Sequence, residues 1–136
     1  MIVKNKMEYL HQDITDKIIK AFYNVYNELG YGFLERVYEK ALLIELRSMG
    51  LECISQDPVK VFYKGILIGD YFSDICVEGL VIVELKAAEI LVDDNELQLI
   101  NYLKATEKEV GLLLNFGKKP EIRRKIFTNN RKFHLK

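Results

Sequence analysis

Several features that would place the chain in a special class are scarce or missing among its 136 residues. It has no tryptophan, two prolines and two cysteines, and it contains no repeat, low-complexity tract or Gly/Ser-rich linker. No apolar run reaches the roughly 20 residues of a membrane span, and the N-terminus does not resemble a secretory signal. Cys53 and Cys76 lack C-x-x-C spacing, so we interpret them as reduced core thiols, with a disulfide or metal pair as the less favoured alternative. These absences predict a cytoplasmic protein with a single domain over residues 1–136 and no membrane partner.

The net charge is zero, but basic residues are concentrated in a C-terminal segment, residues 116–136. Glu121 is its only acid, and its eight basic residues are Lys118, Lys119, Arg123, Arg124, Lys125, Arg131, Lys132 and Lys136. The segment therefore carries +7 and the rest of the chain −7. Such a segment can attract a polyanion; the alternative interpretation is a solvated tail.

Apolar residues recur at helical spacing in the first 50 residues and again near residue 100. The first helix is expected from about Asp13 to Leu29, followed by Gly30 as a cap, and the second from near Phe33 to Gly50. A third helix is expected from about Asp93 to Thr106, capped by Asp93 or Asp94.

Extended patterns fill the remaining segments. Strands are expected over residues 52–56, 58–65, 66–77, 80–87 and 109–117, with a last short strand over 124–128. We interpret the aromatic residues Tyr63, Tyr71 and Phe72 as strand packing and not as a stacking platform. The order α-α-β-β-β-α-β predicts an α/β domain in which a β-meander and a further strand form a mixed central sheet flanked by helices.

Three charged residues interrupt the apolar strands around residue 80: Asp74 in "YFSDICV", and Glu84 and Lys86 in "VIVELKA". A two-residue turn at Glu78-Gly79 would pair Asp74 with Val83 and place Asp74 and Glu84 on opposite faces. A three-residue loop or a bulge would pair Asp74 with Glu84 and bring all three charges together, and this is the register that we expect.

Two carboxylates beside an ammonium group form an oxygen-rich site that suits Mg²⁺ or Mn²⁺. The lysine would orient or deprotonate a water molecule, or neutralise charge that develops on a phosphate. The simpler alternative is that Glu84 and Lys86 end their strand in solvent and that Asp74 is a surface residue.

These motifs resemble a known group of enzymes. "FSDICVEGLVIVELKA" is similar to the D-x(n)-E-x-K signature of the PD-(D/E)xK nuclease superfamily, which has the restriction-endonuclease-like fold. "GFLERVYE" resembles the motif of its GxxExxY family, and Gln98-x-x-x-Tyr102 resembles a motif of RecB-type exonucleases. This sequence differs from the motifs in two ways: Ser73 takes the place of the proline before Asp74, and no histidine occupies the position of the RecB-type metal ligand.

The resemblance implies a role for each residue. Asp74 and Glu84 would bind Mg²⁺ or Mn²⁺ with help from Glu35, Lys86 would act on the attacking water, and Gln98 and Tyr102 would contact ligands or substrate. Alternatively, Glu35 is a solvated helix acid, Tyr102 is core and Gln98 is a boundary residue.

The resemblance predicts a metal-dependent nuclease that hydrolyses phosphodiester bonds in nucleic acid, DNA in our interpretation, with little sequence specificity. The alternatives are a junction-resolving endonuclease that works as a homodimer, and a non-catalytic nucleic-acid-binding or interaction module that keeps the fold.

Overall fold

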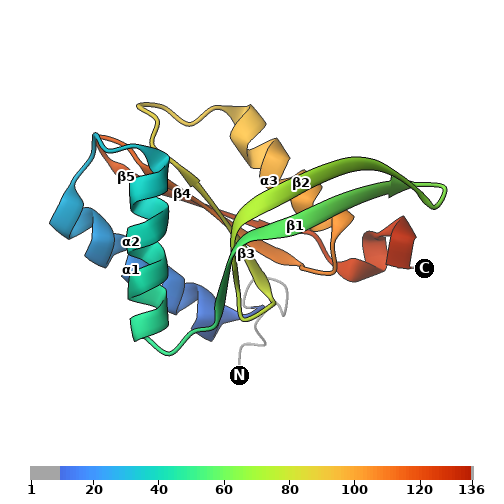
Figure 1. The fold of residues 1–136 in the computed structure, drawn as a ribbon, viewed down its shortest axis with the longest axis horizontal. Helices are drawn as coiled ribbons and strands as arrows, with labels where there is room; N and C mark the ends of the chain where they lie inside the picture. The colour runs from blue at the N-terminus through green and yellow to red at the C-terminus, as the bar shows by residue number, and fades with distance from the viewer. Residues whose placement is uncertain (1–9, 136) are drawn as a thin grey trace, which may run out of the picture.

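The first apolar stripes form two helices that pack against one face of a sheet. The computed structural model describes residues 10–135, with α1 over Gln12–Leu29 and α2 over Glu35–Ser48 (Figure 1). Apolar residues at helical spacing lie on one face of each helix, and this face packs against the sheet. The fully buried side chains on these faces are Ile18 and Phe22 on α1, and Tyr38, Leu42 and Leu46 on α2. The structure thus confirms both predicted helices, to within a few residues at their ends.

The extended segments form a five-stranded mixed sheet in the order β1-β2-β3-β4-β5. The strands are β1 Cys53–Tyr63, β2 Ile66–Val77, β3 Val81–Lys86, β4 Val110–Phe116 and β5 Pro120–Ile126. Only β3 and β4 are parallel, and α3 (Asp93–Ala105) makes the crossover between them. The structure confirms the predicted α/β class and mixed sheet.

The sheet separates two apolar layers. Val81, Val83 and Leu85 of β3 pack with α1 and α2, whereas Ile82 packs with Leu99 of α3. Because side chains alternate along a strand, Glu84 and Lys86 lie on the α3 side with Ile82.

The β1–β2 hairpin leaves the sheet as a two-stranded ribbon (residues 57–72), because β2 pairs with β3 only over residues 75–77 (Figure 1). Two expectations for this region are wrong. A single strand replaces the two expected before residue 65, with Gln56 at φ 55° between its two parts. Moreover, Tyr63, Tyr71 and Phe72 are 61%, 51% and 52% exposed, so they are not packed inside the fold.

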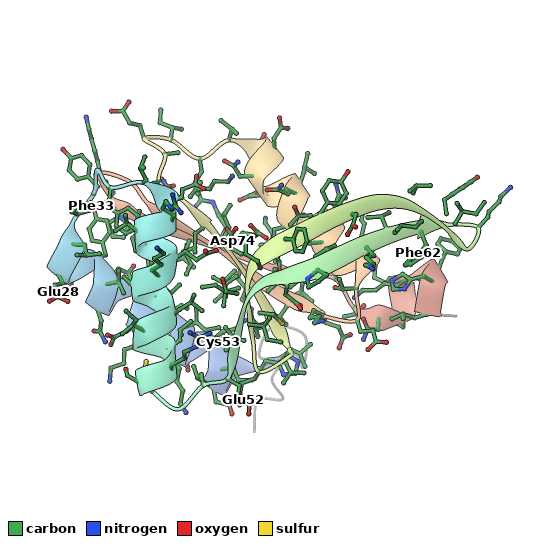
Figure 2. The ribbon with its side chains drawn as sticks, in the orientation of Figure 1. Glu28, Phe33, Glu52, Cys53, Phe62 and Asp74 are labelled. Atoms are coloured by element: carbon green, nitrogen blue, oxygen red, sulfur yellow. The ribbon has the colours of Figure 1, made fainter. Side chains whose placement is uncertain are left out.

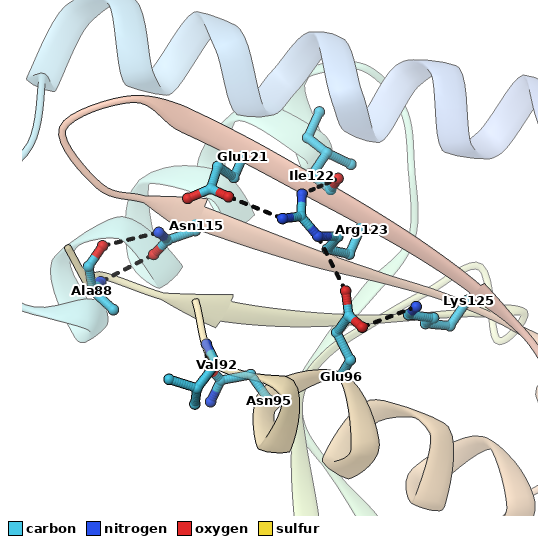
Figure 3. A network of polar contacts seen from close by, with 9 residues as sticks. All are labelled: Ala88, Val92, Asn95, Glu96, Asn115, Glu121, Ile122, Arg123 and Lys125. Atoms are coloured by element: carbon cyan, nitrogen blue, oxygen red, sulfur yellow. Dashed lines mark hydrogen bonds and ion pairs between the residues drawn. The ribbon is translucent and has the colours of Figure 1, made fainter. Parts of the chain in front are cut away.

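The start of α3 also differs from the prediction. The helix begins at Asp93, but the backbone N–H of Val92 donates to the side-chain oxygen of Asn95 (3.1 Å), so neither Asp93 nor Asp94 is the cap (Figure 3). Both cysteines are free thiols, with Cys76 buried and Cys53 half-buried. None of the helices in residues 10–135 is both long and apolar enough to cross a membrane.

The basic C-terminal segment is not a solvated tail, since it supplies β5 at the edge of the sheet. Several of its cations are held by contacts within the fold. Glu96 of α3 binds Arg123 and Lys125 at 3.1 Å each (Figure 3). Arg124 donates to the backbone of Leu10, and the buried Lys132 ammonium donates to two backbone carbonyls. The eighth basic residue, Lys136, lies outside the described residues.

Candidate active site

A three-residue loop between β2 and β3 sets the register of the charged residues. Val77 pairs with Val81, and Ile75 pairs with Val83. The loop residues Glu78 and Gly79 have φ values of 55° and 65°, so glycine suits the second position. This confirms the predicted odd loop, and continuing the same register places Asp74 opposite Glu84.

The two strands separate at Asp74, and side-chain hydrogen bonds replace the backbone ladder there. The backbone N–H of Leu85 donates to Asp74 Oδ2 (2.8 Å), and the N–H of Asp74 donates to Glu84 Oε1 (3.3 Å). Each carboxylate thus takes the place of a strand carbonyl as an acceptor. The divergence of the ribbon from β3 therefore brings the two carboxylates together.

Glu84 is in an unfavourable setting for a charged carboxylate. Its side chain is buried, with 5% of the residue exposed. Burial raises the pKa of Glu84 to about 9, assisted by the negative charge of Asp74 and a side-chain hydrogen bond with it; Lys86 lowers the pKa by a smaller amount. In the metal-free chain Glu84 therefore holds a proton at neutral pH. The idea that Glu84 ends its strand in solvent is wrong.

This carboxyl pair fits a divalent cation by its chemistry. Both side chains offer oxygen, the donor that Mg²⁺ and Mn²⁺ prefer, and a cation would take over the neutralising role of the proton on Glu84. Within residues 10–135, however, no three His, Cys, Asp or Glu side chains are already arranged to hold a metal ion. The expected set of Asp74, Glu84 and Glu35 is thus not assembled, whereas the pair Asp74 and Glu84 is.

Lys86 follows Glu84 on the same face of β3 and is half-buried. Asn115, its partner on β4, is fully buried and holds the chain just beyond Lys86. Its amide group donates to the carbonyl of Ala88 (2.9 Å) and accepts from the N–H of Ala88 (3.0 Å) (Figure 3). Sequence analysis missed this residue, although a lone amide in the apolar run "VGLLLNF" is the pattern of a buried polar clamp.

Helix α2 contributes acids from the other side of Asp74. A cavity of about 180 Å³ is lined by Glu35, Arg36, Glu39, Gln56, Asp74 and Leu85. Glu35 is exposed, whereas Glu39, one turn further along, is half-buried and accepts a hydrogen bond from Gln56 (2.9 Å). Burial, followed by the charge of Asp74, raises the pKa of Glu39. Glu39 is therefore a second helix acid of the site, and sequence analysis did not single it out.

Gln98 and Tyr102 of α3 face the same way, as their spacing predicts. The amide nitrogen of Gln98 donates to the Tyr102 hydroxyl (3.2 Å), and Gln98 is exposed while Tyr102 is 7% exposed. Burial raises the pKa of Tyr102, and the charges of Glu84 and Asp74 raise it further. Tyr102 thus packs in the α3 layer and also borders the carboxyl pair.

One comparison with known proteins gives a match. The family model described as the PD-(D/E)XK nuclease superfamily matches residues 12–125, which include every site residue described above. Neither a curated protein nor a solved structure matches the chain. The family match covers most of the sequence, so the chain belongs to the PD-(D/E)XK nuclease superfamily.

Proposed function

We propose that this protein is a Mg²⁺- or Mn²⁺-dependent nuclease that hydrolyses phosphodiester bonds in DNA with little sequence specificity. One observation carries the proposal: the buried Glu84 and the half-buried Asp74 form a carboxyl pair, with Lys86 two residues beyond Glu84 on the same strand face. An ionised pair of this kind is costly without a cation, and family membership supports nuclease chemistry.

The side chains take complementary roles in this proposal. Asp74 and Glu84 hold the cation, and Glu35 or Glu39 adds a ligand, directly or through water. The bound ion would polarise the phosphate and lower the pKa of a water molecule. The Lys86 ammonium orients the attacking water or donates to a phosphate oxygen. Gln98 and Tyr102 contact the substrate from α3. Resemblance to the GxxExxY motif supports the role of Glu35, and resemblance to the RecB-type motif supports the roles of Gln98 and Tyr102.

Contacts to the DNA backbone need cations near the site. Most of the basic segment is engaged within the fold, but the turn between β4 and β5 carries two exposed lysines: Lys119, and Lys118, whose ion pair with Glu89 (3.3 Å) is itself exposed to solvent. This turn follows Asn115, whose amide binds Ala88 just beyond Lys86. We therefore assign phosphate contacts to these two lysines, which should make binding sensitive to salt.

A cleavage assay tests the proposal. Single-stranded, duplex and branched DNA are incubated with the full chain in Mg²⁺ or Mn²⁺ and with Glu84→Gln, Lys86→Ala and Lys20→Ala, the last a control at an exposed position on α1. We expect cleavage by the unaltered chain and the control, and a loss of at least about 100-fold in the two site variants. The proposal fails if the unaltered chain cleaves nothing, or if the site variants cleave equally well.

A homodimeric, junction-resolving form is favoured by one further observation. Tyr63, Ile66 and Ile68 on the β1–β2 ribbon are each more than half exposed, and exposed apolar surface of this kind is typical of an interface. Light scattering would show a dimer if two ribbons pack together. A monomer at all accessible concentrations would exclude this form.

A further inference from the structure

A groove lies between the β1–β2 ribbon and α3, and it shares Gln98 and Tyr102 with the candidate active site. Its volume is about 630 Å³, within the usual range of about 300–1,000 Å³ for small-molecule sites. Its lining includes Phe62 and Tyr71 from the ribbon, and Leu97, Gln98, Asn101 and Tyr102 from α3. Figure 2 shows Asp74 at the base of the ribbon and Phe62 toward its tip.

Aromatic rings form the ribbon side of this groove. Phe62 and Tyr71 are 55% and 51% exposed. The ring of Tyr71 lies against Gly69, where an added Cβ would come within 2.8 Å of it, and its centre is 6.1 Å from that of Tyr102. The ring is thus held in place by backbone and by Tyr102 while half of the residue stays accessible.

The opposite side of the groove offers hydrogen-bonding groups. Gln98 and Asn101 carry amides that both donate and accept, and both are exposed. Asp94 and Lys104, at opposite ends of α3, contribute charges that cancel. A flat, aromatic ligand with polar edges fits such a lining better than a bare phosphate chain does.

We propose that the groove binds unpaired nucleobases of a single-stranded segment next to the phosphate that is cleaved. The inference rests on the proposed nuclease function, because Gln98 and Tyr102 belong to both the groove and the active site. Bases of a single strand can stack on Tyr71 and Phe62, whereas a duplex keeps its bases stacked on one another. The ribbon and α3 therefore select single-stranded ends, flaps or gaps over continuous duplex.

Three fluorescein-labelled probes of equal length test this selection by anisotropy: an oligothymidine, an abasic strand with the same phosphates, and a duplex. The full chain is titrated in Ca²⁺, beside Tyr71→Leu, Phe62→Leu and the control Phe72→Leu. Phe72 is the neighbour of Tyr71, has nearly equal exposure (52%), and does not line the groove.

We expect the unaltered chain and Phe72→Leu to bind the oligothymidine about tenfold more tightly than the abasic strand or the duplex. Tyr71→Leu and Phe62→Leu should reduce this preference at every salt concentration, without weakening binding to the abasic strand. Stacking does not release counterions, so the salt slope should stay the same.

The inference is overturned if the unaltered chain binds the three probes equally or not at all, or if Tyr71→Leu keeps the preference. It is also overturned if Tyr71→Leu, but not Phe72→Leu, converts a dimer to a monomer, because a second copy would then occupy the groove. A chain that cleaves DNA in Mn²⁺ without preferring unpaired bases keeps the nuclease function and loses only this inference.

Discussion

Replacing Glu84 by glutamine should stabilise the metal-free chain at neutral and alkaline pH. The pKa of Glu84 is raised by burial from its ordinary value of 4.5 to about 9 in the folded chain. Between these values the folded state binds one more proton than the unfolded state, so the free energy of unfolding falls as pH rises, by about 1.4 kcal/mol per pH unit. Glutamine keeps the size and hydrogen-bonding capacity of the protonated acid but does not ionise.

The expected magnitude follows from the pH interval. From pH 4.5 to 7.5 the full effect is about 4 kcal/mol, and relaxation around the Asp74–Glu84 pair reduces it, so we expect Glu84→Gln to be more stable by about 2–4 kcal/mol at pH 7.5. Near pH 4.5 the two chains should be similar. Urea unfolding followed by circular dichroism at several pH values measures this difference.

The matched control is Glu28→Gln, at an exposed position on α1 far from Asp74 (Figure 2). It should change stability by less than about 1 kcal/mol. A stability difference for Glu84→Gln that is the same at pH 5 and pH 8, or a variant less stable throughout, would refute the reasoning on the buried Glu84 carboxyl group.

Three further experiments test other parts of the site and the fold. Lys86→Ala should still bind Mn²⁺ in a calorimetric titration but lose cleavage, and loss of Mn²⁺ binding would show a structural rather than catalytic lysine. Asn115→Ala removes two hydrogen bonds to Ala88 and should lower the free energy of unfolding by about 2–3 kcal/mol in urea, whereas a change below about 0.5 kcal/mol would contradict the clamp. Burial raises the pKa of Cys76 to about 11, so mass spectrometry should find the half-buried Cys53 alkylated first at pH 7.5; equal rates in the folded chain would be the contrary result.

The helices and the site register were predictable from local patterns. The stripes of α1 and α2 repeat at helical spacing because one face of each helix packs on the sheet. The position of Asp74 opposite Glu84 depends on a single loop length, and the three-residue loop was expected because that register, or a bulge, brings the three charges together. The spacing of the three charges, together with the alternation of faces, therefore predicted the register.

Features that depend on distant contacts were not predictable. The ribbon aromatics follow strand patterns, but no pattern shows that β2 leaves β3 at Asp74 and exposes them. Glu39 belongs to the site because Gln56 reaches it from β1, with its backbone at an unusual φ of 55°. The basic segment resembles a tail in composition, whereas Glu96 draws Arg123 and Lys125 into the fold.

The most direct test of the metal-binding claim is a calorimetric titration with Mn²⁺ at pH 7.5 in two buffers of different ionisation enthalpy. Glu84 is protonated in the metal-free chain, so binding should release about one proton, and the apparent enthalpy should differ between buffers accordingly. Asp74→Asn and Glu84→Gln should abolish or greatly weaken the binding. Millimolar Mn²⁺ that produces no binding heat, or binding unchanged in both variants, would contradict the account.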